Sequence, residues 1–236
     1  MPAAYAELRA QAFEANREIV RAGLVVLTFG NASALDRDAG VMAIKPSGVG
    51  YDDLGLDSIV VVDLESGAVV EGAFRPSSDA PTHLVLYRTF AETAGIVHTH
   101  SPFATAWAQA CREIPCFGTT HADHFRGSVP VTRALTADEI AGDYEAKSGD
   151  VIVETLAALG LGPLEMPAVL VASHAPFTWG ADPSEAVENA VALEAVAAAA
   201  FRTEQLSSGA EPIAEELLRR HFSRKHGPAA YYGQSR

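Results

Sequence analysis

Runs of apolar residues with two different spacings divide the chain into expected strands and helices. Short runs rich in valine and isoleucine, separated by glycine, serine and proline, are typical of β-strands. In the segment 58–72, the residues ESG lie between two apolar runs and predict a β-hairpin. The expected strands lie within 24–36, 41–48, 58–72, 94–100 and 168–173, and near 116 and 129.

Longer segments with helical spacing of apolar residues alternate with these strands. Gly23 is a typical residue just after a helix, and Pro81 and Pro183 suit the first turn of a helix. The expected helices are 3–22, 81–93, 102–110, 136–158 with a break near Gly149, 183–206 and 211–225. Hairpin strands mixed with helices favour an α/β fold in layers, with a mixed, mostly antiparallel sheet. Without repeats or linkers, we expect one domain over 1–236.

Composition narrows the possible partners and location. The 236 residues are 48% hydrophobic, which suffices for a sizeable core, but no run approaches the roughly 20 apolar residues of a membrane span. The N-terminus lacks a signal-peptide pattern, so we expect a cytoplasmic protein. Cys111 and Cys116 form no CxxC motif and are expected to be unpaired. The net charge of −13 disfavours nucleic acid and anionic membranes as partners, and any anionic substrate needs locally positive surroundings.

Three of the eight histidines are candidates for a metal site. His98 and His100 are separated by one residue at the end of an apolar run, so in a strand they share one face. His174 follows another apolar run, where we expect the rim of the sheet. Three imidazoles that leave one coordination position open are typical of a catalytic zinc ion. Each histidine taken alone is more typical of a structural residue than of a metal ligand.

Two aspartates have alternative interpretations that spacing alone does not decide. Asp79 precedes the helix opened by Pro81, so it is either an N-cap or a metal ligand. Asp123 lies between His121 and His124 in a segment that we expect to be a loop, where a carboxylate is either catalytic or simply solvated.

Three turns before the histidine pair carry groups that bind anions. The segments TFGNAS (28–33), KPSGVG (45–50) and RPSSD (75–79) combine glycine or serine turns with hydroxyls, and two of them contain Lys45 or Arg75. Exposed backbone N–H groups in such turns form anion nests. Each segment alone is typical of an ordinary turn, but together they favour a small phosphorylated ligand.

Taken together, these segments resemble the class II aldolase and sugar-phosphate epimerase family. The similar stretches are LTFGNASA, IKPSGV, VVEGAFRPSSDAPTH, AGIVHTH, GTTHAD, MPAVLVASHAPFTWG and RKHGPAAYYGQ, which span nearly the whole chain. The resemblance implies a three-layer α/β/α fold with a largely antiparallel central sheet, and a homotetramer whose active sites are shared between subunits.

The resemblance also implies roles for individual residues. It implies a divalent metal, zinc or another cation such as manganese, on His98, His100, His174 and Asp79. It implies an acid/base pair of Asp123 and Tyr232, with Tyr232 reaching a neighbouring subunit. The substrate-binding residues implied by the family pattern are Gly30, Asn31, Lys45, Ser47, Gly48, Ser77 and Ser78, with Thr119, Glu145, His221 and Arg224 as further residues that shape the site.

The implied activity is 4-epimerisation of L-ribulose 5-phosphate to D-xylulose 5-phosphate, in pentose or arabinose metabolism. The route is retro-aldol cleavage to an enediolate and glycolaldehyde phosphate, followed by aldol addition. An aldolase of the L-fuculose-1-phosphate type is the alternative, and Asp79 with Tyr232 argues against it. A non-catalytic adducin-like scaffold is disfavoured by the three histidines, and a zinc hydrolase by the lack of HExxH. His124 and Arg126 depart from the residues usual in the family.

Overall fold

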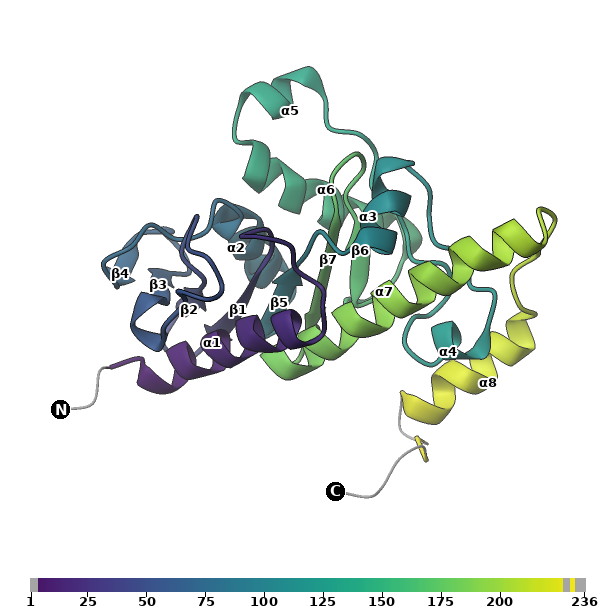
Figure 1. The fold of residues 1–236 in the computed structure, drawn as a ribbon, viewed down its shortest axis with the longest axis horizontal. Helices are drawn as coiled ribbons and strands as arrows, with labels where there is room; N and C mark the ends of the chain where they lie inside the picture. Colours follow the sequence, from purple (N-terminus) through teal and green to yellow (C-terminus); the bar gives the residue numbers. More distant parts are fainter. Residues whose placement is uncertain (1–3, 227–229, 232–236) are drawn as a thin grey trace.

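The computed structural model describes residues 4–226 and 230–231. Within these residues the chain forms seven strands and eight α-helices, which Figure 1 shows. The strands are β1 (Asn31–Asp36), β2 (Val41–Ile44), β3 (Val60–Asp63), β4 (Val69–Glu71), β5 (Gly95–His98), β6 (Ala168–Leu170) and β7 (Pro176–Gly180). The helices are α1 (Ala6–Arg21), α2 (Ala80–Thr89), α3 (Pro102–Gln109), α4 (Thr119–Ala122), α5 (Ala137–Ala141), α6 (Tyr144–Leu159), α7 (Pro183–Leu206) and α8 (Glu215–Lys225), and a 3₁₀ turn spans Leu56–Ser58.

The seven strands form one sheet in the order β4-β3-β2-β1-β5-β7-β6, and every neighbouring pair is antiparallel. β3 and β4 are the hairpin that the sequence predicted around ESG. The register that matters for function is the pairing of Asn31 at the start of β1 with His98 at the end of β5. This pairing brings the first of the three anion-binding turns next to the histidine pair.

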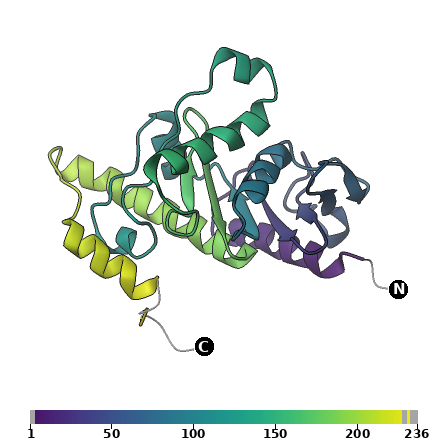
Figure 2. The ribbon, with the colours of Figure 1, turned by 180° about the vertical axis from the view of Figure 1, so that it is seen from behind.

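Helices cover both faces of the sheet, as Figures 1 and 2 show from opposite sides. In β1, Ala32 and Ala34 face α1, whereas Leu35 belongs to the larger cluster beneath α2 and α6. This alternation is the two-residue period of a strand buried on both sides. The predicted three-layer α/β/α architecture with an antiparallel sheet is therefore confirmed. In the described part of the chain, no helix has both the length and the apolar character to cross a bilayer.

The helix predicted over 136–158 is broken at a different glycine from the one expected. The break lies at Gly142, where α5 ends and Asp143 precedes α6. Gly149 lies inside α6, and a Cβ there would meet Val85 of α2 at only 2.7 Å. Glycine at this position therefore permits two helices to pack closely and does not interrupt the helix.

Other element boundaries also differ from the prediction. The strands expected near 116 and 129 are reduced to one isolated bridge between Ile114 and Val129. The last helix begins at Glu215 and not at 211, because Ala214 is its N-cap and Ile213 N instead donates to the Cys116 carbonyl at 2.9 Å. The second helix ends at Thr89, four residues early, because Phe90 leaves the helix to pack against Trp179.

Two elements were missed by the sequence analysis. The segment after Gly118 was expected to be a loop, but it forms the single helical turn α4. Strand β7 was not predicted, because its first residue is Pro176 and it follows closely on β6. The first residue of a strand is one of the few places in a sheet that tolerate proline, so Pro176 is compatible with β7.

Candidate metal and phosphate site

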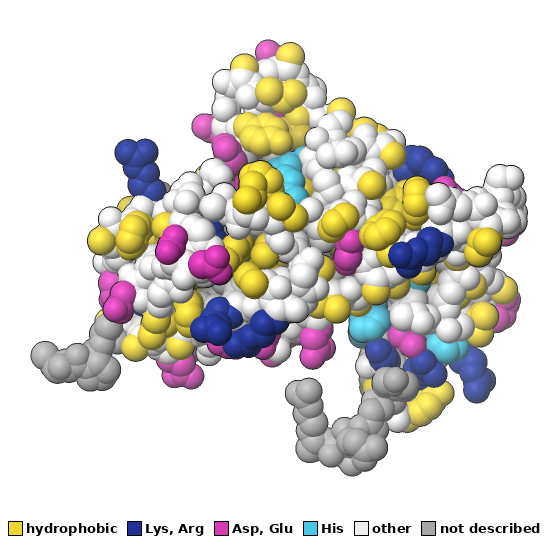
Figure 3. All heavy atoms as spheres, viewed as in Figure 1, with side chains coloured by type: hydrophobic (Ala, Val, Ile, Leu, Met, Phe, Trp, Pro, Cys, Tyr) yellow, Lys and Arg dark blue, Asp and Glu magenta, His cyan; other side chains and the backbone are white. Residues whose placement is uncertain are grey.

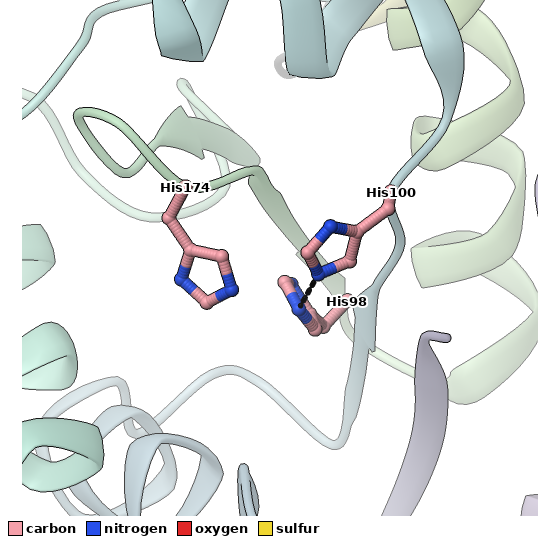
Figure 4. Close-up of side chains that lie close together, drawn as sticks. All are labelled: His98, His100 and His174. Atoms are coloured by element: carbon pink, nitrogen blue, oxygen red, sulfur yellow. Dashed lines mark hydrogen bonds between the residues drawn. The ribbon is translucent and has the colours of Figure 1, made fainter. Parts of the chain in front are cut away.

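Three histidine side chains converge where β5 ends and where β6 turns into β7 (Figure 4). One ring nitrogen from each of His98, His100 and His174 lies within 4.8 Å of the others. The two Nε2 atoms of His98 and His100 are 3.1 Å apart. His98 is the last residue of β5 and His100 lies just beyond the strand, and the two rings converge as the spacing predicted. His174 comes from the β6–β7 turn, as predicted from its place after an apolar run.

Neighbouring groups fix which nitrogen of each ring faces the cluster. His98 Nδ1 donates to the Pro176 carbonyl at 2.9 Å, and its ring stacks on Phe177 with centroids 4.2 Å apart. This leaves Nε2 of His98 with a free lone pair. His174 Nδ1 lies 3.4 Å from the hydroxyl of Tyr144, so its Nε2 is also directed to the cluster. Metal-binding histidines in proteins typically have such a partner on the second nitrogen.

The donor set fits a divalent transition metal. Burial and the neighbouring His98 ring lower the pKa of His174 to about 4, and the same two causes lower the pKa of His100. Neutral imidazoles are the form that binds a metal. Among the described residues the cluster has three nitrogen donors, which is typical of zinc sites that keep one position for substrate.

Asp79 lies beside the histidines, but its carboxylate is not part of the cluster of mutually close ligand atoms. It occupies the N-cap position of α2, yet its side chain makes no capping hydrogen bond. Instead Asn31 Nδ2 donates to Asp79 Oδ2 at 2.7 Å and to Ser77 Oγ at 3.0 Å. Burial opposes ionisation of Asp79, but the nearby His98 and the hydrogen bond from Asn31 hold its pKa below the usual value. Asp79 is therefore the N-cap residue of α2 by position, but its side chain does not cap the helix, and a metal-ligand role remains a prediction.

The three anion-binding turns converge next to these histidines. The second and third turns are joined by backbone hydrogen bonds, from Ser47 N to Arg75 O at 3.0 Å and from Ser77 N to Lys45 O at 2.9 Å. The first turn joins them through Asn31, which contacts Ser77. Segments separated by up to about fifty residues in the chain thus form one lining.

Within this lining, side chains differ in exposure. Lys45, Asn31 and Ser77 are buried, whereas Ser47, Gly48 and Ser78 are exposed. Gly30 has a φ of +89°, and a Cβ there would lie 2.8 Å from the His98 carbonyl oxygen. The first turn therefore passes against the strand that carries His98, and a residue larger than glycine does not fit there.

A second group of polar residues surrounds Asp123. Arg224 Nε donates to Asp123 Oδ1 at 2.8 Å, and His221 Nδ1 lies 3.0 Å from the same oxygen. Although burial opposes ionisation of Asp123, the hydrogen bonds from Arg224 and His221 lower its pKa. Thr119 is the first residue of α4, and its carbonyl accepts from Asp123 N. Asp123, Thr119, His221 and Arg224, which the resemblance placed in the site, thus come together.

The other histidines of this region have local partners. His121 is buried, and its Nε2 donates to the Gly127 carbonyl at 2.9 Å. Burial lowers its pKa to about 4, which favours the structural interpretation of this histidine. The departures from the family pattern lie close by: His124 Nε2 is 3.3 Å from Lys225 Nζ, and Arg126 pairs with Glu165 at the surface.

The two groups are separate within one chain. In Figure 1, α4 and α8 lie below the long helix α7, whereas the β6–β7 turn lies above it. Figure 3 likewise shows histidine side chains at two distinct places on this face. Glu145, in the first turn of α6, belongs to the metal side, because its carbonyl accepts from Thr82 of α2 at 2.6 Å. Tyr232 lies outside the described residues.

Comparisons with known proteins agree with this geometry. The model of the class II aldolase and adducin N-terminal domain matches residues 10–201. The chain belongs to this class II aldolase family. Similar proteins include the L-ribulose-5-phosphate 4-epimerase UlaF of Salmonella typhi and that of Salmonella paratyphi C. Each is 51% identical over 228 residues, covering 97% of this chain and 99% of the relative.

Solved structures of the class II aldolase family share the fold. An L-fuculose 1-phosphate aldolase aligns with a TM-score of 0.77 at 24% identity, covering 95% of this chain and 97% of its own. YgbL of Klebsiella pneumoniae, a putative aldolase/epimerase/decarboxylase, aligns with a TM-score of 0.71 at 24% identity, covering 91% and 97%. At this identity the likeness concerns the fold alone.

Sequence reasoning missed two tyrosines that contact the site. Tyr144 touches His174, and Tyr51 contacts both Gly30 and Lys45. Tyr144 adjoins the predicted Glu145, which was the only available signal for it. Tyr51 directly follows the KPSGVG turn, but nothing in its local sequence indicates which way its side chain points.

Proposed function

We propose that this protein is an L-ribulose-5-phosphate 4-epimerase, an isomerase that interconverts L-ribulose 5-phosphate and D-xylulose 5-phosphate. The observation that carries the proposal is the 51% identity to relatives of that name over 97% of the chain. The aligned region covers nearly the whole chain and is not confined to one part of it. The histidine cluster beside three anion-binding turns supports the same conclusion.

The reaction explains why such a site is needed. The hydrogen on carbon 4 is not acidic, so simple deprotonation does not invert that centre. Removal of the proton from the carbon 4 hydroxyl instead breaks the bond between carbons 3 and 4. This gives glycolaldehyde phosphate and the enediolate of dihydroxyacetone. After the aldehyde rotates, the enediolate carbon adds to its other face, and the oxygen on carbon 4 takes up a proton.

We propose that His98, His100 and His174 hold a zinc ion, with manganese as the alternative, and that Asp79 contributes a carboxylate. When bound, the cation supplies Lewis-acid stabilisation of negative charge on the three-carbon fragment. Asn31 orients Asp79 and belongs to the same lining as Lys45 and Ser77. These turns would retain the phosphorylated aldehyde while it rotates, so that it adds back and is not released.

Asp123 is our candidate for one proton-transfer group, and Tyr232 for the other. Arg224 and His221 favour the ionised form of Asp123, which is the form that accepts a proton. Because Asp123 lies apart from the histidine cluster within one chain, we propose that a neighbouring copy presents its Asp123 and Tyr232 to the cluster. We propose that this assembly is the homotetramer with shared sites that the family resemblance implies. The cytoplasmic location expected from the sequence stays a prediction.

Activity is tested by following conversion of L-ribulose 5-phosphate to D-xylulose 5-phosphate in a coupled assay. We expect turnover that a chelator abolishes and that added zinc or manganese restores. A metal-replete protein without turnover would refute the proposed activity, and release of aldehyde in a second assay would then favour an aldolase.

Sharing of the site is tested by mixing two inactive variants. His98→Asn removes a metal-binding nitrogen and Asp123→Asn removes the proton acceptor, so each protein alone should be inactive. Co-expressed subunits should recover activity, because some interfaces then combine an intact histidine cluster with an intact Asp123. In the control, a chain that carries both changes is co-expressed with a His98→Asn chain. No subunit then has an intact histidine cluster, so this mixture should stay inactive. Deletion of 229–236 should abolish turnover if Tyr232 acts as proposed.

A further inference from the structure

Tyr51 connects two of the three turns that line the candidate phosphate site. Its hydroxyl donates to the Gly30 carbonyl at 2.9 Å, in the turn before β1. The Lys45 ammonium lies over its ring, 4.8 Å from the centroid. Tyr51 itself is half-buried and packs against the apolar clusters beneath α1. One side chain therefore sets the spacing between an ammonium group and a backbone turn that belong to different segments.

Lys45 depends on this ring because few other groups compensate for its burial. The residue is 2% exposed, and within the described residues its ammonium has one hydrogen-bond acceptor, the Pro46 carbonyl at 3.4 Å. A desolvated ammonium is stabilised by the negative face of an aromatic ring. Burial lowers the pKa of the Lys45 ammonium, and the Tyr51 ring opposes this loss of charge and holds the group in place.

The hydroxyl of Tyr51 acts on the other turn. Gly30 is held between Tyr51 on one side and the His98 carbonyl oxygen on the other. The next residue, Asn31, donates to both Ser77 and Asp79. A shift of Gly30 would therefore displace the amide that organises the third turn.

We infer that Tyr51 is a positioning residue that fixes Lys45 and the turn around Gly30 for binding the phosphate ester of the substrate. The inference rests on the proposed function, because it takes a sugar phosphate as the ligand of these turns. The ring and the hydroxyl make separable contributions. The ring acts on the lysine, and the hydroxyl acts on the glycine turn.

Two variants separate these contributions, and a third serves as a control. Tyr51→Phe keeps the ring and loses the hydrogen bond, whereas Tyr51→Leu loses both. Tyr5→Phe is the matched control, because Tyr5 is also half-buried in the cluster beneath α1 and its hydroxyl makes no hydrogen bond within the described residues. For each protein, binding of inorganic phosphate is measured by calorimetry, zinc affinity by competition with a chelator, and KM and kcat with L-ribulose 5-phosphate.

We expect Tyr51→Phe to weaken phosphate binding and raise KM about 3- to 10-fold, as for loss of one hydrogen bond. Tyr51→Leu should weaken both by a further several-fold through loss of the cation–π contact. Zinc affinity should change much less than phosphate binding, because Tyr51 reaches only Asp79 among the proposed ligands, through Gly30 and Asn31. Tyr5→Phe should match the wild type throughout.

Two results would overturn the inference. The first is that Tyr51→Leu binds inorganic phosphate as tightly as the wild type does. The same conclusion holds if neither protein binds phosphate. The other is a parallel loss of phosphate and zinc affinity, which would indicate general damage to the fold. Failure of the proposed function is distinguishable, because a wild type without turnover of L-ribulose 5-phosphate still reports on Tyr51 through inorganic phosphate.

Discussion

Replacing Gly149 by alanine tests whether the close packing of α2 on α6 supports the site. An added Cβ would lie 2.7 Å from Val85 Cβ, 2.9 Å from Val85 Cγ1 and 3.2 Å from the Thr82 carbonyl oxygen. Contacts of this kind force at least one helix to move. The two helices carry Asp79 at the start of α2 and Tyr144 at the start of α6, so separation would also disturb the site.

Two opposing terms determine the expected size of the effect. Alanine in a helix interior is favoured over glycine by about 1 kcal/mol. Overpacking of a filled interface costs about 1–3 kcal/mol, and here the nearest atom is a Cβ, which moves only with its backbone. The packing term should exceed the helix term, so Gly149→Ala should lower the free energy of unfolding by up to about 2 kcal/mol.

Urea unfolding followed by circular dichroism measures this free energy. Ala157→Gly, at an exposed position of the same helix, is the matched control. It should be destabilising by up to about 1 kcal/mol through helix propensity alone. Glycine would then be the better residue at 149 and the worse one at 157. A Gly149→Ala protein that is more stable than the wild type would refute the reasoning.

Three further predictions concern the site. The Asp79→Glu protein should release aldehyde as an aldolase side activity, because a longer carboxylate favours proton transfer over metal ligation. Chromatography that finds no released aldehyde would count against this expectation. Asp123→Asn should lower the unfolding free energy at pH 7. The ion pair with Arg224 lowers the pKa of Asp123 in the folded protein. The difference in unfolding free energy between wild type and variant should therefore be lost as the pH falls from about 4 through that lowered pKa. A difference that does not change with pH in denaturant titrations would contradict this expectation. Tyr144→Phe should weaken zinc binding about 10-fold, because the variant loses the contact of the hydroxyl to His174. Zinc affinity is measured by titrating metal-free protein, and an unchanged affinity would exclude a role of Tyr144 in orienting His174.

The parts of the site that depend on local pattern were predictable from the sequence. His98 and His100 follow an apolar run, and His174 follows another, so their place where strands end could be predicted. The hairpin around ESG and the long helix opened by Pro183 were also predicted correctly, because turn residues and helix signals are short-range.

The parts that depend on contacts between distant segments were not predictable from the residues alone. Asn31 and Asp79 are 48 positions apart, and only the folded chain shows that the amide takes the carboxylate away from its capping role. Gly149 and Gly142 look alike in sequence, yet one interrupts a helix and the other accommodates a neighbour. Tyr51 differs from other tyrosines only through the turns that it contacts.

The separation of Asp123 from the histidine cluster has a consequence for how much enzyme a cell needs. Under the proposed shared site, a dissociated chain holds both halves of the machinery but has no complete copy of it. Specific activity should then fall on dilution as association equilibria shift, even though each chain stays folded. Synthesis of the protein would have to exceed a threshold concentration before flux through the reaction began.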